Sequence, residues 1–115
     1  MILKADNLKK ELKNGMRGGA GTAEIMHLEH PDRLSNGRLF AQITLPPGAG
    51  IGPHIHEGET EYYHIISGTG IVEEQDGSKE VSAGDVVITG GGDSHSIENT
   101  GSSPLVFTAL ILFDQ

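Results

Sequence analysis

Three histidines and one glutamate carry the clearest chemistry in this sequence. His54, His56 and Glu61 fall within eight residues, and His95 follows in a later stretch. Neutral imidazole and carboxylate groups are ligands for divalent transition metals. The spacing of His54 and His56 places both rings on one face of an extended strand, because side chains two residues apart point the same way. We therefore predict that these four side chains bind one metal ion.

The ligand set narrows the choice of metal. Three histidines and one carboxylate on a six-coordinate ion leave two positions for water, substrate or dioxygen, which suits Mn²⁺, Fe²⁺, Co²⁺ or Ni²⁺. Zn²⁺ is also compatible with this shell, and four protein ligands would then close the site, as in a structural centre. We expect one divalent ion per chain, and the sequence leaves its identity open.

Residues close to these ligands are weaker candidates. Tyr63 shares a strand face with Glu61, so it is a candidate catalytic residue whose hydroxyl would lie near the metal; packing into the wall is the favoured alternative. His64 points to the opposite face, where it would serve an interface or sheet packing. Glu57 and Glu59 are expected to be solvent-facing loop charges, with a mobile acid or base at the mouth of the site as the alternative.

The elements that must position these residues are short strands. Seventeen glycines and five prolines in 115 residues favour an all-β chain with many tight turns. Strands are expected over residues 22–28, 38–45, 53–56, 61–66, 71–74, 79–82, 86–89, 95–99 and 104–113. Such spacing predicts a sandwich or barrel in one domain.

Residues 38–45 alternate most clearly between two faces. One face carries Leu39, Ala41, Ile43 and Leu45, and the other carries Arg38, Phe40, Gln42 and Thr44. If the second face is the inner one, Gln42 and Thr44 would bring polar groups into the cavity and Phe40 would form an apolar pocket wall.

The N-terminal residues 1–21 are expected to form an arm outside the main domain, which spans residues 22–115. The segment from Asp6 to Leu12 could form one or two helical turns with Asp6 as the cap. The glycine-rich loop from Met16 to Gly21 favours a turn that lets backbone segments pack closely. The alternative is that Met16 and Arg17 line the mouth of a pocket.

Two longer motifs resemble those of the cupin superfamily. The first runs through Gly48, His54-x-His56, Glu61 and Gly68, and the second through Gly84, Gly90-x-Gly92, His95 and Asn99. One position departs, because the family usually has proline where this chain has Gly90. That proline shapes a turn and donates no ligand, so the departure affects the rigidity of the corner more than metal binding.

The resemblance to cupins implies a fold and an assembly. It implies a double-stranded β-helix, a jelly-roll barrel with the metal inside. It also implies a homodimer, often formed by exchange of N-terminal strands, for which residues 1–21 are the candidates.

Composition excludes several kinds of partner. Sixteen acidic residues against eight basic ones give a formal net charge of −8, which argues against nucleic acid and anionic membrane surfaces. The longest apolar run, residues 105–113, is too short to span a bilayer.

The absence of cysteine rules out thiolate ligands and a cysteine nucleophile. No apolar signal region is evident at the N-terminus, so a cytoplasmic location is expected.

Two functions fit this pattern, and the sequence does not decide between them. One is a metal-dependent enzyme on a small organic substrate, of the dioxygenase, decarboxylase, lyase or isomerase class that the resemblance to cupins implies. The other is a small-molecule-binding or sensor protein in which the metal is structural or positions the ligand. No lysine or arginine occurs between Leu39 and Ser78, which weakens anionic substrates unless the metal itself holds the anion.

Overall fold

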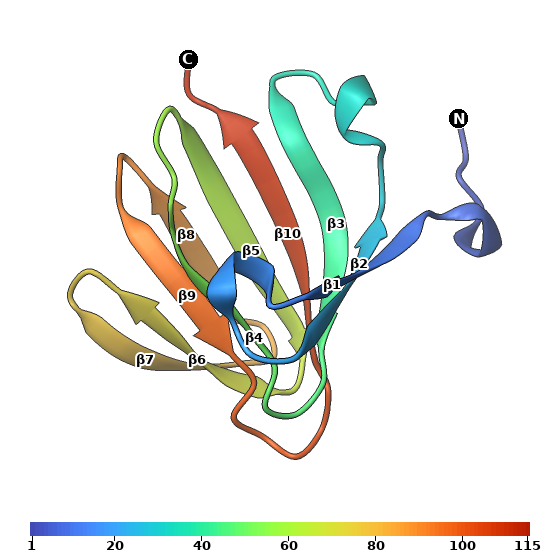
Figure 1. Cartoon of the computed structure of the whole chain (residues 1–115). Helices are drawn as coiled ribbons and strands as arrows, with labels where there is room; N and C mark the ends of the chain where they lie inside the picture. The colour runs from blue at the N-terminus through green and yellow to red at the C-terminus, as the bar shows by residue number, and fades with distance from the viewer.

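The computed structural model describes residues 1–115 as ten β-strands with three short 3-10 helices (Figure 1). The all-β class predicted from the sequence is confirmed. None of the short helices approaches the length and hydrophobicity needed to cross a membrane. The elements in chain order are η1 (Ala5–Asn7), β1 (Lys10–Asn14), η2 (Met16–Gly18), β2 (Thr22–His27), η3 (Pro31–Arg33), β3 (Gly37–Leu45), β4 (Gly50–Ile55), β5 (Glu59–Ser67), β6 (Thr69–Glu74), β7 (Gly77–Ser82), β8 (Val86–Gly90), β9 (Ser94–Glu98) and β10 (Leu105–Phe113).

The strands form two antiparallel sheets. The larger sheet has the order β1-β2-β3-β10-β5-β8, and the smaller has the order β4-β9-β6-β7. Strands far apart in the sequence are neighbours, as in the β3–β10 and β4–β9 pairs. This is the jelly-roll arrangement expected for the chain. The two sheets remain separate ladders that pack on one another, rather than one closed ring of hydrogen-bonded strands.

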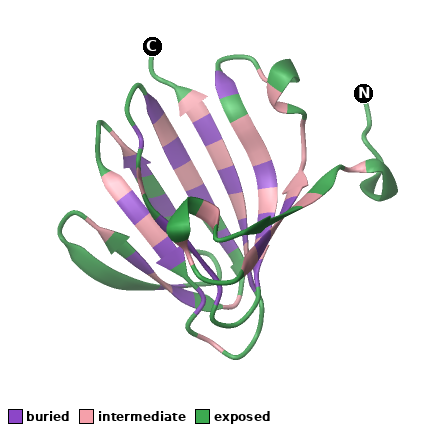
Figure 2. Cartoon of the chain, in the orientation of Figure 1, coloured by how far each residue is buried: buried purple, intermediate pink, exposed green.

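The hydrophobic core lies between the sheets, and buried residues alternate with more exposed ones along the strands (Figure 2). On β3, Ala41, Ile43 and Leu45 are buried, and Leu39 packs against the same core. β5 and β10 alternate in the same way, with Ile65 and Phe107 among their inward residues. Alternation therefore sets which side chains of each strand can reach the interior.

The inner face of β3 is the one that carries Leu39, Ala41, Ile43 and Leu45, so Phe40, Gln42 and Thr44 lie on the outer face. The alternative in which Gln42 and Thr44 line the cavity is wrong. Phe40 has apolar neighbours outside the core, because it pairs with Leu110 of β10. An apolar outer face makes the two sides of this strand hard to distinguish from the sequence alone.

β1 forms where helical turns were expected. Helical backbone is limited to Ala5–Asn7, and β1 pairs with β2 from Lys10 opposite Met26 to Asn14 opposite Thr22. The expectation of helix up to Leu12 is wrong because a helix of two turns is marginal alone, whereas a strand here satisfies the backbone groups of the β2 edge. Exchange of residues 1–21 with a second protomer stays a prediction, as does the domain boundary after residue 21.

The glycine-rich loop around η2 packs its backbone directly on β4. A Cβ atom at Gly52 would collide with the carbonyl oxygen of Arg17, and one at Gly19 would collide with that of Gly50. Only residues without a side chain permit this approach. The favoured interpretation of the loop is therefore confirmed. Met16 packs against the hydrophobic core beside it.

Gly90 occupies the position at which the second motif usually has proline. It ends β8 opposite Thr60. A Cβ atom there would lie 2.6 Å from Oγ1 of Thr60 and 3.1 Å from the carbonyl oxygen of Glu59. The turn itself is made by Gly91 and Gly92, whose φ angles are 66° and 87°. The corner before β9 thus depends on the two glycines that follow Gly90.

Candidate metal centre

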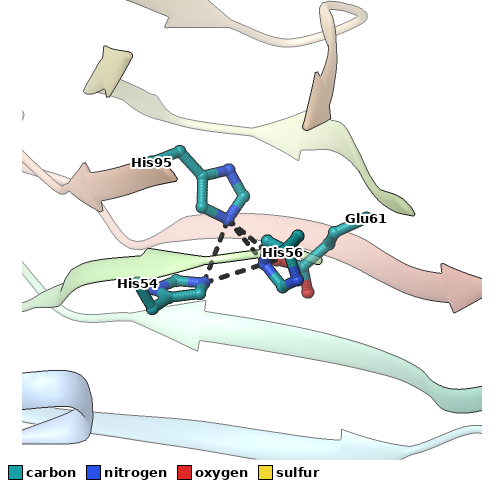
Figure 3. A group of neighbouring side chains, drawn as sticks. All are labelled: His54, His56, Glu61 and His95. Carbon is teal, nitrogen blue, oxygen red and sulfur yellow. Dashed lines mark hydrogen bonds and ion pairs between the residues drawn. The ribbon is translucent and has the colours of Figure 1, made fainter. Parts of the chain in front are cut away.

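The four predicted ligands meet between the two sheets (Figure 3). His54 and His95 lie on β4 and β9 of the smaller sheet, His56 follows β4 directly, and Glu61 lies on β5 of the larger sheet. Nε2 of His95 lies 3.0 Å from Nε2 of His54, 3.1 Å from Nε2 of His56 and 2.9 Å from Oε1 of Glu61. All four donor atoms lie within 4.8 Å of one another, so they could hold one metal ion.

Backbone contacts bring the three histidines together. His54 is directly opposite His95 in the β4–β9 ladder. The backbone amide of His56 donates to the carbonyl of Asp93 at 3.0 Å, and the carbonyl of His56 accepts from the amide of Gly92 at 2.9 Å. The glycine corner, residues 90–93, therefore holds the backbone of His56. It also leads into β9, the strand that carries His95.

Each histidine has a hydrogen-bond partner for its Nδ1 atom. The partners are the carbonyl of Gly52 for His54 at 2.8 Å, Oε2 of Glu59 for His56 at 2.6 Å, and Oγ1 of Thr89 for His95 at 2.8 Å. A carbonyl and a carboxylate only accept, so Nδ1 of His54 and Nδ1 of His56 donate to them, and the hydroxyl of Thr89 can accept from Nδ1 of His95. A neutral imidazole that donates through Nδ1 presents Nε2 as a metal ligand. The three Nε2 atoms and the Glu61 carboxylate therefore form a donor set that fits a divalent metal.

The charges of the site also match metal binding. Burial acts to raise the pKa of Glu61, but contacts with His54 and His95 outweigh burial and hold this pKa at about 2. Burial, as the largest cause, lowers the pKa of His95 below its ordinary value. Glu61 is therefore ionised and His95 neutral near neutral pH, the states in which both are ligands.

Tyr63 lies inside the fold against the site. Its ring stacks on His95 with centroids 4.9 Å apart at 15°, and it packs on Phe107 with centroids 4.6 Å apart. Burial, with the nearby charge of Glu61, raises the pKa of Tyr63 well above its ordinary value. Tyr63 thus forms an aromatic wall beside a ligand, while a catalytic role for its hydroxyl stays a prediction.

Two residues that hold the histidines were not recognised from the sequence. Glu59 was expected to be a solvent-facing loop charge, but it is buried on β5 and contacts both His56 and Arg38. The signal was available, because Glu59 is two residues before Glu61 and therefore shares its strand face. Thr89 is buried on β8, and no spacing rule pointed from it to a histidine on another strand.

The remaining histidines lie away from the site. His64 is exposed on the outer face of β5, as predicted from alternation. His27 is half-buried and contacts Oε1 of Glu11 at 2.8 Å, which joins β1 to β2. His30 lies in an exposed turn, where its Nδ1 accepts from the backbone amide of Asp32, and none of these three histidines contributes to the four-residue cluster.

Comparison with known proteins agrees with this fold and site. A model of the cupin domain matches residues 41–112. An oxalate-binding protein of Thermotoga maritima is 42% identical over 113 residues, which cover 97% of this chain and 93% of that protein. The crystal structure of a predicted oxalate decarboxylase from Thermotoga maritima superposes with a TM-score of 0.91 at 41% identity, covering 99% of this chain and 100% of the other. A sugar phosphate isomerase of Silicibacter pomeroyi shares the fold at 17% identity, with a TM-score of 0.80 over 99% of this chain and 76% of its own.

These matches, with the jelly-roll topology and the cluster of three histidines and a glutamate, define the class: the chain belongs to the cupin family. The resemblance seen in the two sequence motifs is confirmed. The motifs also contain all four residues of the cluster.

Proposed function

We propose that this cupin binds one divalent transition metal through its His54, His56, Glu61 and His95 side chains, and that the bound metal holds a small carboxylate ligand of the oxalate class. The observation that carries the proposal is the convergence of three imidazole Nε2 atoms and one ionised carboxylate. Similarity to an oxalate-binding protein over 97% of the chain supports the ligand class. Mn²⁺, Fe²⁺, Co²⁺, Ni²⁺ and Zn²⁺ all accept this donor set.

The scarcity of cationic side chains supports an anion held by the metal. Residues 39–78 contain no lysine or arginine, and both carboxylate oxygens of Glu59 already engage Arg38. A dicarboxylate entering the site would need another positive charge. A divalent cation supplies that charge and acts as a Lewis acid. The chain itself orients the imidazole rings and supplies an apolar wall through Tyr63, on which Phe107 packs from behind.

Binding without turnover is better supported than catalysis. Acid–base chemistry needs a positioned group that can exchange a proton with the ligand. Glu59 is held by Arg38 and His56, and the raised pKa of the buried Tyr63 keeps its hydroxyl protonated, so neither is positioned to act as a base. Decarboxylation is the second candidate, favoured by 41% identity to a predicted oxalate decarboxylase. Dioxygenase, lyase and isomerase chemistry rests on family membership alone.

Three measurements on one preparation test the proposal. Elemental analysis of protein purified without an affinity metal identifies the ion. Calorimetric titration with oxalate is expected to show binding to the metal-loaded protein and none to the metal-free protein. Oxalate recovered unchanged supports a binding protein, and release of formate and carbon dioxide supports the decarboxylase. If the protein contains metal but does not bind oxalate, the proposed ligand class is overturned and the metal is assigned a structural role.

We further propose a homodimer, for which the outer face of the larger sheet supplies the support. Ile88, Tyr62, Leu110 and Phe40 are consecutive cross-strand neighbours on β8, β5, β10 and β3. This row places apolar side chains across four strands, and Ile88 is 60% exposed. Light scattering on the wild-type protein and on an Ile88→Lys variant tests it, since the variant is expected to be monomeric. A cytoplasmic location stays a prediction.

A further inference from the structure

A chain of three charged or ionisable residues runs from the surface to the candidate metal. Nε and Nη2 of Arg38 each donate to a carboxylate oxygen of Glu59 at 2.7 Å. Oε2 of Glu59 accepts from Nδ1 of His56 at 2.6 Å. The side chain of Arg38 is 43% exposed, whereas that of His56 is 1% exposed. The three residues thus connect solvent to a buried ligand.

His56 differs from the other two histidines in the partner of its Nδ1 atom. Nδ1 of His54 meets a backbone carbonyl, and Nδ1 of His95 meets a neutral hydroxyl. Among the three Nδ1 atoms, only that of His56 faces a carboxylate, which favours the Nδ1–H tautomer and makes Nε2 a stronger donor to a metal. The two parallel hydrogen bonds from Arg38 hold that carboxylate in one orientation.

We propose that Glu59 is a positioning residue for the metal, which holds His56 as the Nδ1–H tautomer, and that Arg38 keeps Glu59 in place. This inference rests on the metal site of the proposed function. Both carboxylate oxygens of Glu59 accept hydrogen bonds from Arg38, and Oε2 also accepts from Nδ1 of His56. Glu59 therefore acts as an acceptor, and its role is to orient a ligand rather than to exchange protons with a substrate.

The first test compares Glu59→Gln with Glu57→Gln, a matched control at an exposed position two residues away. An amide can present its NH₂ group to Nδ1 of His56, which would move the ring proton to Nε2 and block metal binding. NMR spectra correlating ring protons with ring nitrogens, recorded on the metal-free proteins, report the tautomer directly. We expect Glu59→Gln to lose the Nδ1–H form of His56 and Glu57→Gln to keep it.

The second readout is Mn²⁺ affinity, measured by titration of the same proteins. Loss of a partner that orients a ligand typically weakens metal binding by about 10- to 100-fold, and we expect that loss in Glu59→Gln but not in Glu57→Gln. Arg38→Met should weaken Mn²⁺ binding as well, because Glu59 loses its anchor. Arg38→Lys keeps the charge without the paired hydrogen bonds and should fall between Arg38→Met and the wild type.

The outcomes separate this inference from the metal site itself. Glu59→Gln that keeps both the Nδ1–H form of His56 and wild-type Mn²⁺ affinity would overturn the role of Glu59. Wild-type protein that binds no Mn²⁺ would count against that metal in the proposed function, while the tautomer spectra would still decide what Glu59 does. If Glu59→Gln does not fold, the Arg38 series decides, since equal Mn²⁺ affinity in wild type, Arg38→Lys and Arg38→Met would contradict the proposal.

Discussion

Nε2 of His95 lies 2.9 Å from Oε1 of Glu61, although the two residues are 34 positions apart and belong to different sheets. A neutral histidine and an ionised carboxylate meet here in a buried place, beside the Nε2 atoms of His54 and His56. Buried polar groups in proteins normally have a hydrogen-bond or ligand partner. The partner that matches all four donors is a divalent cation.

Removal of a ligand is expected to remove most of the metal. His56→Ala and Glu61→Ala each delete one donor of the shell and leave the others without a complete site. Elemental analysis of the purified variants measures the loss, and the melting temperature with metal should fall toward that of metal-free protein. His64→Ala, on the outer face, is the control that should keep its metal. Full metal content in both ligand variants would contradict the assigned shell.

The metal-free protein is expected to lose stability in acid. Glu59 and Glu61 have a pKa of about 2 when folded, against an ordinary value of 4.5. A carboxyl group with a lowered folded pKa stabilises the fold above its unfolded pKa and loses this contribution as the pH falls through the folded value. Urea unfolding from neutral pH down to about pH 2 should therefore show a falling free energy of unfolding below about pH 4.5.

Arg38→Met should change that pH dependence in a defined way. Arg38 is the largest cause of the low pKa of Glu59, so its removal should raise this pKa toward the ordinary value. The variant should be less stable near neutral pH and should lose less stability in acid than the wild type. Arg33→Met is the control, because the Arg33 contact to Glu29 is longer, at 3.8 Å, and on the surface. If the free energy of unfolding changes with pH by the same slope in Arg38→Met and in the wild type, the pairing of Arg38 with Glu59 is contradicted.

Gly52→Ala should destabilise the protein through a backbone collision. Its Cβ atom would collide with the carbonyl oxygen of Arg17, and overpacking of this kind costs about 1–3 kcal/mol. Because the carbonyl of Gly52 accepts from Nδ1 of His54, Mn²⁺ affinity should fall as well. Urea unfolding and Mn²⁺ titration measure the two effects.

Gly58→Ala separates collision from backbone strain. Gly58 has a φ of 71° with open space around it, so alanine there meets strain alone. We expect a smaller loss of stability in Gly58→Ala and no change in Mn²⁺ affinity. Equal effects of the two substitutions on Mn²⁺ binding would show that contact between the η2 loop and β4 does not orient His54.

Tyr63→Phe tests whether the hydroxyl of Tyr63 has a part in the chemistry. The phenyl ring preserves stacking on His95 and packing on Phe107, so metal content and oxalate affinity should match the wild type. Tyr63→Ala should instead cost about 3–5 kcal/mol of stability, as for other buried aromatic residues. If the wild type releases formate from oxalate and Tyr63→Phe does not, Tyr63 is a catalytic residue rather than a wall.

Alternation predicted that His54 and His56 share one face, and His95 stands directly opposite His54 in the β4–β9 ladder. Glu61 lies on the other sheet, so the spacing of the two sequence motifs, rather than alternation, indicated that it joins the histidines. Alternation would have placed Glu59 beside Glu61. The contact from Thr89 to His95 joins two strands of different sheets, and a periodic pattern carries no information about such a pair.

Two errors have a common physical origin. Periodicity separates the faces of a strand but does not say which is inside, and on β3 both faces carry apolar side chains, such as Ile43 and Phe40. For residues 6–12, helix spacing was a weak signal, and the open edge of β2 offered backbone hydrogen bonds that a short helix cannot match. In both cases long-range packing decided the outcome.

The glycine corner before β9 limits where this chain can accept inserted sequence. Gly92 and Asp93 hold the backbone of His56, and His95 follows two residues later, so added length at the corner would displace two ligands at once. The β6–β7 hairpin turns at an exposed tip around Asp76, and its strands contribute none of the four ligands. Loop extension, tags or fused domains therefore belong at the hairpin tip, whereas the length of the corner is fixed by the site.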